Sequence, residues 1–172
     1  ETTVAPSANV KRLMQMLGSK LYGSPENIAA VSIKEIFQNS FDAVKEALEK
    51  GTEERGNIWI DVDPDERTIT IVDDGPGMPA SVMGNQFLQI AGTVKGTSRP
   101  SGGLGIAKML FLFENEALEV VSLRDGQLTQ MVTNGNDLKA SFDDPQRRPK
   151  LVTTSDPDEI ERFLRKDEDA RN

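Results

Sequence analysis

The sequence has 172 residues, a formal net charge of −8, and neither cysteine nor histidine. The absence of cysteine excludes disulfides, thiolate metal sites and cysteine nucleophiles, and the absence of histidine leaves acid–base chemistry to carboxylates, lysines or Tyr22. The negative charge argues against non-specific nucleic-acid binding by this chain alone, although domains outside it could bind DNA. With 37% hydrophobic residues, no membrane-length apolar run and no signal peptide, we expect a cytoplasmic globular domain.

The first half of the chain is predicted to be helical. Residues 1–8 read as a loose tail, and because the chain starts at Glu1 rather than Met we treat it as a candidate fragment of a longer protein. A short helix is expected over Asn9–Leu21 and a long one over Pro25–Lys50, with Ser24 as N-cap and Gly51 ending it. At about 100° per residue its core stripe comprises Ile33, Ile36, Phe37, Val44, Ala47 and Leu48.

The opposite face of the long helix carries Glu35, Asn39 and Asp42. One interpretation is an ordinary solvated face. Asparagine argues against it, because a mid-helix asparagine is a poor helix former and usually has another role.

Two strands and a loop follow. Asn57–Asp63 places Ile58, Ile60 and Val62 on one side, as in a half-buried strand, and Thr68–Val72 is the second strand. In the loop at residues 73–79, Asp73 could accept a hydrogen bond from an exocyclic amine, and Gly75 and Gly77 would let a flat ring approach the backbone. The alternative is a tight Asp-Gly turn.

A second glycine-rich segment lies further along. We expect a short helix over Ala80–Ile90, a mobile stretch over residues 91–105, and a buried helix over Ile106–Phe113. Gly102, Gly103 and Gly105 precede this helix, where free N–H groups and the helix dipole favour an anion. The segment matches neither the Walker A loop nor the GxGxxG fingerprint.

The last third reads as hairpins and a final helix. Strands are expected over Leu118–Leu123 and Gln127–Thr133, with turns at residues 124–126 and 134–136. Asp143–Lys150 looks irregular, and an acidic helix runs from Pro157 to Lys166 behind a Ser155 or Asp156 cap. Hairpins mixed with one-sided helices indicate an α+β two-layer sandwich.

Three segments carry a family resemblance in their order and spacing: Glu35-x-x-x-Asn39-Ser-x-Asp42-Ala43, Asp73-Asp-Gly75-Pro-Gly77-Met78 and Gly102-Gly103-Leu104-Gly105-Ile106. Together they resemble the three boxes of the GHKL superfamily of ATPases, which includes gyrase B-type topoisomerases, ninety-kilodalton heat-shock chaperones, MutL-type repair proteins and sensor histidine kinases. The resemblance implies a Bergerat fold: a mixed, mostly antiparallel sheet with helices on one face, a single domain over residues 1–172, and an ATP lid over residues 84–102.

The resemblance also implies roles for individual residues. Asp73 would bind the adenine amine, and Asn39 would give its amide oxygen to Mg²⁺, which retains water and phosphate ligands. The amides of Gly103 to Ile106 would cradle the phosphates. Leu104 and Gly105 lie within that phosphate-binding segment, and the remaining members of the implied nucleotide site are Asp42, Ala43, Gly75, Gly77, Met78 and Gly102. Lys95, Arg99 and Lys108 are candidate phosphate-side cations, with solvated surface positions as the alternative.

Glu35 distinguishes branches of the superfamily. A carboxylate one turn before the magnesium-binding asparagine could accept a proton from the attacking water, which makes hydrolysis the natural reaction. This glutamate resembles the gyrase, chaperone and repair branches, whereas sensor kinases usually lack it. Residues 19–25 and 91–97 look chaperone-like, while residues 101–104 and 121–135 look gyrase-like, so no single branch is selected.

Two departures from the family pattern limit the expected activity. The Gly-Thr pair near the adenine has no clear match; Thr129 or Thr133 are candidates, or it lies beyond residue 172. The domain whose lysine reaches the γ-phosphate in gyrase and repair proteins is absent, so slow hydrolysis is expected.

Two functions remain open. The first is an ATPase that closes its lid and dimerises within a chaperone-, topoisomerase- or repair-like machine. The second is a nucleotide-gated binding or dimerisation module with little catalysis; a kinase-type domain that phosphorylates a partner is a further alternative.

Overall fold

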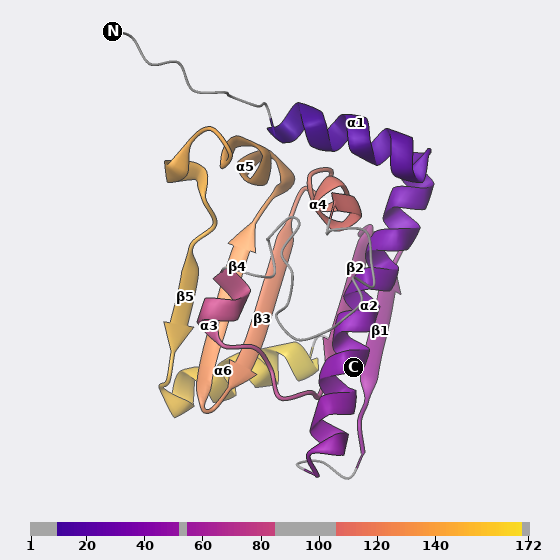
Figure 1. Cartoon of the computed structure of the whole chain (residues 1–172). Helices are drawn as coiled ribbons and strands as arrows, with labels where there is room; N and C mark the ends of the chain where they lie inside the picture. The colour runs from indigo at the N-terminus through magenta and orange to yellow at the C-terminus, as the bar shows by residue number, and fades with distance from the viewer. Residues whose placement is uncertain (1–9, 52–54, 85–105, 170–172) are drawn as a thin grey trace, which may run out of the picture. The chain divides into compact units, whose positions relative to one another are not determined.

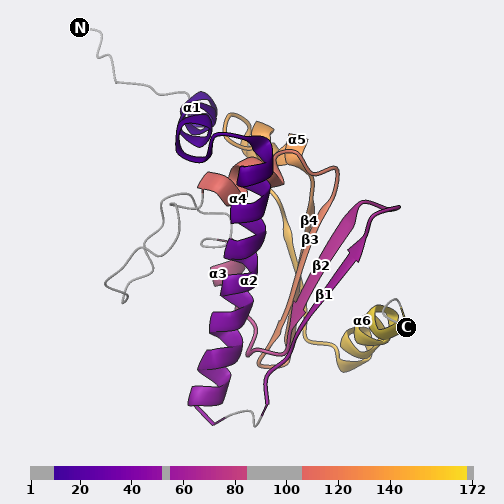
Figure 2. The same ribbon diagram turned by 90° about the vertical axis from the view of Figure 1, so that its right-hand side faces the viewer.

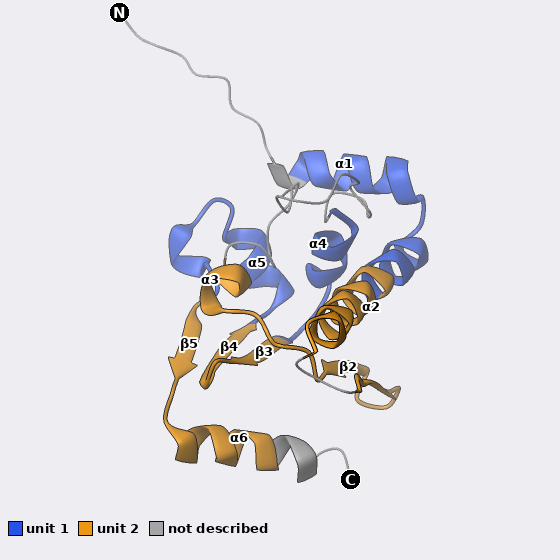
Figure 3. Ribbon diagram, turned by 60° about the horizontal axis from the view of Figure 1, so that its bottom comes forward, with its two compact units in different colours: residues 1–33, 89–118, 133–149 blue, residues 34–88, 119–132, 150–172 orange. Residues whose placement is uncertain are grey.

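The computed structural model describes residues 10–51, 55–84 and 106–169 of the chain (Figure 1). The elements are α1 (Val10–Tyr22), α2 (Pro25–Glu49), β1 (Ile58–Asp63), β2 (Thr68–Asp73), α3 (Ala80–Val82), α4 (Ile106–Leu112), β3 (Leu118–Arg124), β4 (Gln127–Thr133), α5 (Gly135–Ala140), the 3₁₀ helix η2 (Pro145–Arg147), β5 (Leu151–Thr154) and α6 (Pro157–Asp169). Two compact units are formed (Figure 3): unit 1 has residues 1–33, 89–118 and 133–149, and unit 2 has residues 34–88, 119–132 and 150–172.

The long helix α2 begins and ends as its capping residues predict. The Ser24 hydroxyl oxygen accepts a hydrogen bond from the backbone N–H of Asn27 at 3.3 Å, and Pro25 is the first helical residue. Backbone and Ser24 hydrogen bonds hold the pKa of Glu26 below its ordinary value. At the other end Gly51 has a φ of 66° and donates to the Leu48 carbonyl at 3.0 Å, which suits glycine.

Unit 1 is held together by close helix packing. Gly18 of α1 lies against Leu110 of α4, and a Cβ at position 18 would stand 2.0 Å from a Leu110 methyl carbon. The apolar core of this unit comprises Met14, Ile106, Ala107, Met109, Leu112, Phe113 and Leu138. The ring of Phe113 meets that of Phe142 edge-on at 6.0 Å between centroids.

Unit 2 contains most of the strands. β1 and β2 form an antiparallel pair in which Ile58 lies opposite Asp73, and β3, β4 and β5 form a three-stranded sheet in that order. Within this unit α2 lies on one side of the strands and α6 on the other (Figure 2). The α+β class is confirmed. The final helix, α6, was expected, but it lies on the opposite side of the strands from α2 rather than on the same face (Figure 2).

Two local predictions were wrong and two were incomplete. Residues 134–136 are not a simple turn, because Asn134 caps α5 by accepting from the Asp137 N–H at 2.9 Å. The stretch over Asp143–Lys150, predicted as irregular, includes the 3₁₀ helix η2, and the short strand β5 was not predicted. Ile60 and Val62, expected on the half-buried side of β1, are 53% and 61% exposed. Alternation predicts which side chains share a face of a strand, but not whether another element covers that face.

The buried face of α2 differs from the predicted core stripe and includes polar residues. Val44 and Ala47 are buried as expected, but Phe37 and Leu48 are 38% and 40% exposed. The buried face of the helix instead extends to two serines, Ser32 and Ser40. The Ser32 hydroxyl is accommodated because it donates to the Ile28 carbonyl at 2.6 Å. Across the described ranges, no helix is both long and apolar enough to cross a bilayer.

Candidate functional site

One row of residues on α2 carries three of the predicted positions. Glu35, Asn39 and Ala43 are spaced by four, so they follow one another along the same helix face with about 6 Å between neighbouring Cβ atoms. Glu35 is half-buried, with its Oε1 atom buried, while Asn39 is exposed. Asp42 is also exposed, and its carboxylate accepts a hydrogen bond from the Gln38 amide at 2.9 Å.

The two adjacent aspartates after β2 have different surroundings. Asp74 is held by Asn57, whose backbone N–H and side-chain amide donate to its two carboxylate oxygens at 2.8 and 2.7 Å. Asp73, the last residue of β2, is half-buried and accepts only the Gly75 N–H at 3.1 Å among the described residues. Asp74 therefore anchors the loop, and Asp73 keeps one carboxylate oxygen available.

The loop after β2 lies directly against the polar row of α2. A Cβ at Gly75 would stand 2.8 Å from Oδ1 of Asp73, 3.0 Å from the Ala43 Cβ and 3.2 Å from the Ala43 carbonyl carbon. Only glycine permits so close an approach without displacing one of these groups. The contact brings the first two of the three motif segments together within unit 2.

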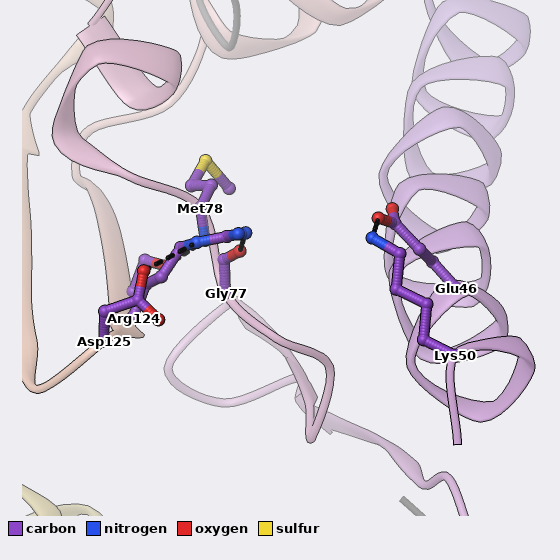
Figure 4. Close-up of polar contacts among 7 residues, drawn as sticks. Glu46, Lys50, Gly77, Met78, Arg124 and Asp125 are labelled. Carbon is purple, nitrogen blue, oxygen red and sulfur yellow. Dashed lines mark hydrogen bonds and ion pairs between the residues drawn. The ribbon is translucent and has the colours of Figure 1, made fainter. Parts of the chain in front are cut away.

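The far end of the same loop is attached to β3 (Figure 4). The N–H of Met78 donates to the Ser122 hydroxyl oxygen at 2.7 Å, and the Arg124 guanidinium donates to the Gly77 carbonyl at 3.1 Å. Gly77 has a φ of 67°, and a Cβ there would stand 2.2 Å from the Leu123 carbonyl oxygen. Both the backbone conformation and the available space require glycine at this position.

A hollow of about 280 Å³ lies beside this loop, within unit 2. Its lining includes two predicted residues, Met78 and Thr129, but neither Asp73 nor Asn39; the other lining residues are Pro79, Arg124, Asp125, Gln127 and Ser155. Of the two threonine candidates, Thr129 is 1% exposed and lines this hollow together with Met78. Thr133, in unit 1, is 9% exposed.

The third motif segment is described only in part. Ile106 and Lys108 belong to α4 in unit 1 and are 4% and 8% exposed, so Lys108 is not the solvated surface lysine of the alternative interpretation. The predicted residues Lys95, Arg99, Gly102, Gly103, Leu104 and Gly105 lie outside the described residues, as does the lid from residue 85 onwards.

Sequence reasoning missed three residues that hold the loop: Asn57, Ser122 and Arg124. The sequence predicts Asn57 only as the start of a strand and Arg124 only as part of a hairpin turn. A weak signal existed, since Ser122 and Arg124 are two positions apart on a strand and therefore share one face. Nothing in the sequence indicated that this face meets residues 77 and 78.

The match to known proteins agrees with this arrangement. The sequence model of the family described as histidine kinase-, DNA gyrase B- and HSP90-like ATPase matches residues 29–135, which is more than half of the chain. The chain belongs to this family, and so to the GHKL superfamily, and membership supports ATP binding.

Part of the chain is also similar to two chaperone sequences. The chain is 33% identical over 84 residues to the chaperone protein HtpG of Coxiella burnetii, in strains RSA 331 and RSA 493. The match covers 44% of this chain but 13% of each relative, so the chain spans only about an eighth of their length.

Proposed function

We propose that the chain is a Mg²⁺-ATP-binding, ATP-hydrolysing domain whose nucleotide lies along the Glu35–Asn39–Ala43 row of α2. The contact between Gly75 and Ala43 carries this proposal, because it puts the Asp73 carboxylate at one end of the row. Asn39 lies one turn along the helix and Glu35 two turns along, about 12 Å away. A nucleoside triphosphate is an elongated ligand with its base and terminal phosphate at opposite ends, which suits such a row.

The base is assigned to the Asp73 end. Asp73 is half-buried and has a carboxylate oxygen available to accept the adenine 6-amino group, whereas Asp74 is occupied by Asn57. Glycine at position 75 leaves the backbone open to a flat ring. Ala43 offers a small apolar contact at the same place, and Gly77 and Met78 continue the surface.

Asn39 is proposed as the protein ligand of Mg²⁺. Its exposed amide oxygen is a hard ligand of the kind that Mg²⁺ accepts, and its side chain has no hydrogen bond to any described residue. No group of three or more carboxylates gathers within the described ranges, so the ion would be held mainly through phosphate and water oxygens. When bound, the ion neutralises charge on the phosphates. The amides of Gly103 to Ile106, and the cations Lys95, Arg99 and Lys108, remain proposed phosphate contacts.

Glu35 is proposed as the general base for hydrolysis. It lies one helical turn beyond Asn39, at the end of the row assigned to the terminal phosphate. A carboxylate there can orient the attacking water and accept its proton.

The wider machine is proposed by similarity. The chaperone title of the relatives supports a role inside a larger protein. In this proposal residues 1–172 form a single ATP-binding domain, and the larger protein is cytoplasmic. ATP binding would close the lid at residues 84–102 and drive homodimerisation. The topoisomerase-like and repair-like machines remain alternatives within the same proposal.

The test compares Glu35→Gln with Glu49→Gln, a matched change on the same helix at an exposed, ion-paired position. Glu35→Gln should lower phosphate release by about 10²–10⁴-fold and leave ATP affinity nearly unchanged. The Glu49 variant should behave as wild type. Full turnover in Glu35→Gln would refute the role of Glu35. ATP-dependent dimers with negligible phosphate release from the wild type would instead favour the nucleotide-gated module.

A further inference from the structure

We propose that Ser122 and Arg124 of β3 are positioning residues for base recognition: together they lock the Gly77–Met78 peptide and thereby hold the loop that presents Asp73. This inference rests on the proposed function, because it concerns how the same site recognises its base. Neither residue is assigned contact with the nucleotide.

The two contacts grip a single peptide unit. The carbonyl of Gly77 and the N–H of Met78 belong to one amide plane, and β3 binds both ends of it. Ser122 and Arg124 can do so because residues two apart on a strand project from the same face. Figure 4 shows the Arg124 side chain reaching the Gly77 carbonyl while Asp125 lies beside it.

The Gly77–Met78 peptide requires these two hydrogen bonds because one of its residues is glycine. Glycine tolerates many backbone conformations, so the peptide that follows Gly77 could otherwise rotate. Here its carbonyl receives a charge-assisted hydrogen bond from Arg124, and its N–H donates to Ser122, which is 7% exposed. Rotation would break both bonds and leave a buried hydroxyl without this partner.

The other end of the loop is fixed independently. Asn57 donates twice to the Asp74 carboxylate, and the Asp74 N–H returns a bond to the Asn57 carbonyl at 3.3 Å. Only Gly75 and Pro76 lie between the two fixed points. The loop is thus held on both sides of the Gly75–Ala43 contact, so Asp73 does not need to be ordered when the base binds.

The experiment measures base discrimination rather than affinity alone. Dissociation constants are measured for ATP and for purine riboside triphosphate, which lacks the 6-amino group, with wild type, Ser122→Ala, Arg124→Ala and Arg124→Lys. Arg165→Ala, which removes an exposed arginine paired with Glu161 on α6, is the matched control. Urea unfolding of each variant reports stability separately, and Arg124→Lys retains a positive donor beside the hollow that Arg124 lines.

In wild type the amine should strengthen binding by about tenfold or more. We expect Ser122→Ala and Arg124→Ala to weaken ATP several-fold while scarcely changing the analogue, so that the ratio of the two constants falls towards one. Arg124→Lys should restore part of the ratio, and Arg165→Ala should keep it. If Ser122→Ala and the Arg124 variants that fold keep the wild-type ratio, the positioning role is overturned while the proposed function still stands. No ATP binding by the wild type refutes the proposed function, and this inference with it.

Discussion

Gly75 approaches Ala43 so closely that a Cβ at position 75 would stand 3.0 Å from the Ala43 Cβ. This contact joins the middle of helix α2 to the loop after strand β2. Because Asp73 accepts the Gly75 N–H, the same turn also fixes the aspartate beside the helix. A polar helix face and a strand-end carboxylate, distant in sequence, therefore form one surface in unit 2.

Gly75→Ala should destabilise this surface. The new methyl group would meet the Asp73 carboxylate and the Ala43 backbone, and relieving such overpacking costs about 1–3 kcal/mol. Urea unfolding should show this loss, and calorimetry should show weaker ATP binding. Gly84→Ala is the control for the unfolding measurement only, because its methyl group would meet only the end of the Leu151 side chain, at 3.2 Å, whereas position 84 begins the proposed lid. A Gly75→Ala variant that is as stable as Gly84→Ala and binds ATP as tightly as the wild type would contradict the packing.

Asp73→Asn should mainly affect ATP binding, whereas Asp74→Asn should mainly affect stability. Asp73→Asn should weaken ATP binding by about 1.5–3 kcal/mol, since a charged hydrogen bond to the base is lost. Asp74→Asn removes the charge that Asn57 stabilises and should mainly lower the free energy of unfolding. Calorimetric titration and urea unfolding of both variants separate the two effects. If Asp74→Asn loses ATP binding while Asp73→Asn keeps it, the adenine has been assigned to the wrong aspartate.

Asn39→Ala should remove much of the magnesium dependence of ATP binding. In wild type we expect Mg²⁺ to strengthen ATP binding, and the variant should lose roughly tenfold or more of that gain. The measurement compares ATP dissociation constants in Mg²⁺ and in EDTA. Gln38→Ala is the neighbouring amide control, because Gln38 instead donates to Asp42. Unchanged magnesium dependence in Asn39→Ala would remove Asn39 from the metal site.

The end of α2 gives a prediction that depends on pH. Lys50 donates a hydrogen bond to Glu46 and, with its charge, holds the pKa of Glu46 below its ordinary value of 4.5 (Figure 4). Because the pKa is lowered on folding, any stabilisation is present above pH 4.5 and is lost as the pH falls through the folded value. In Lys50→Ala, an NMR titration should return the pKa of Glu46 towards 4.5. No upward change would show that the ion pair is absent in solution.

The bounds of α2 could be predicted because helix ends are set by local chemistry. Ser24, Pro25 and Gly51 mark its start and end, and each acts as the sequence indicates. By contrast, β5 is four residues long and exists through its pairing with β4, where Leu151 lies opposite Met131. Such a non-local pairing leaves little trace in a short segment, and the strand was missed.

In the candidate site, too, local features could be predicted from the sequence and non-local contacts could not. Motif spacing identified Asp73, but the distinct environments of Asp73 and Asp74 depend on Asn57, which lies on the preceding strand. The attachment of Gly77 and Met78 to β3 was likewise invisible, because it joins segments far apart in the chain. The sequence identified which residue types belong to the site, whereas the different role of each residue follows only from its contacts in the structure.

The most direct test of the nucleotide's placement is photolabelling with two ATP probes, one carrying its azide on the adenine ring and one on the γ-phosphate, followed by peptide mass spectrometry. The account predicts that the adenine probe labels α2 near Ala43 or the loop at residues 75–78. The γ-phosphate probe should label the helix near Glu35, and unlabelled ATP should protect both sites. Labelling in the reverse order, or labelling that ATP does not prevent, would contradict it.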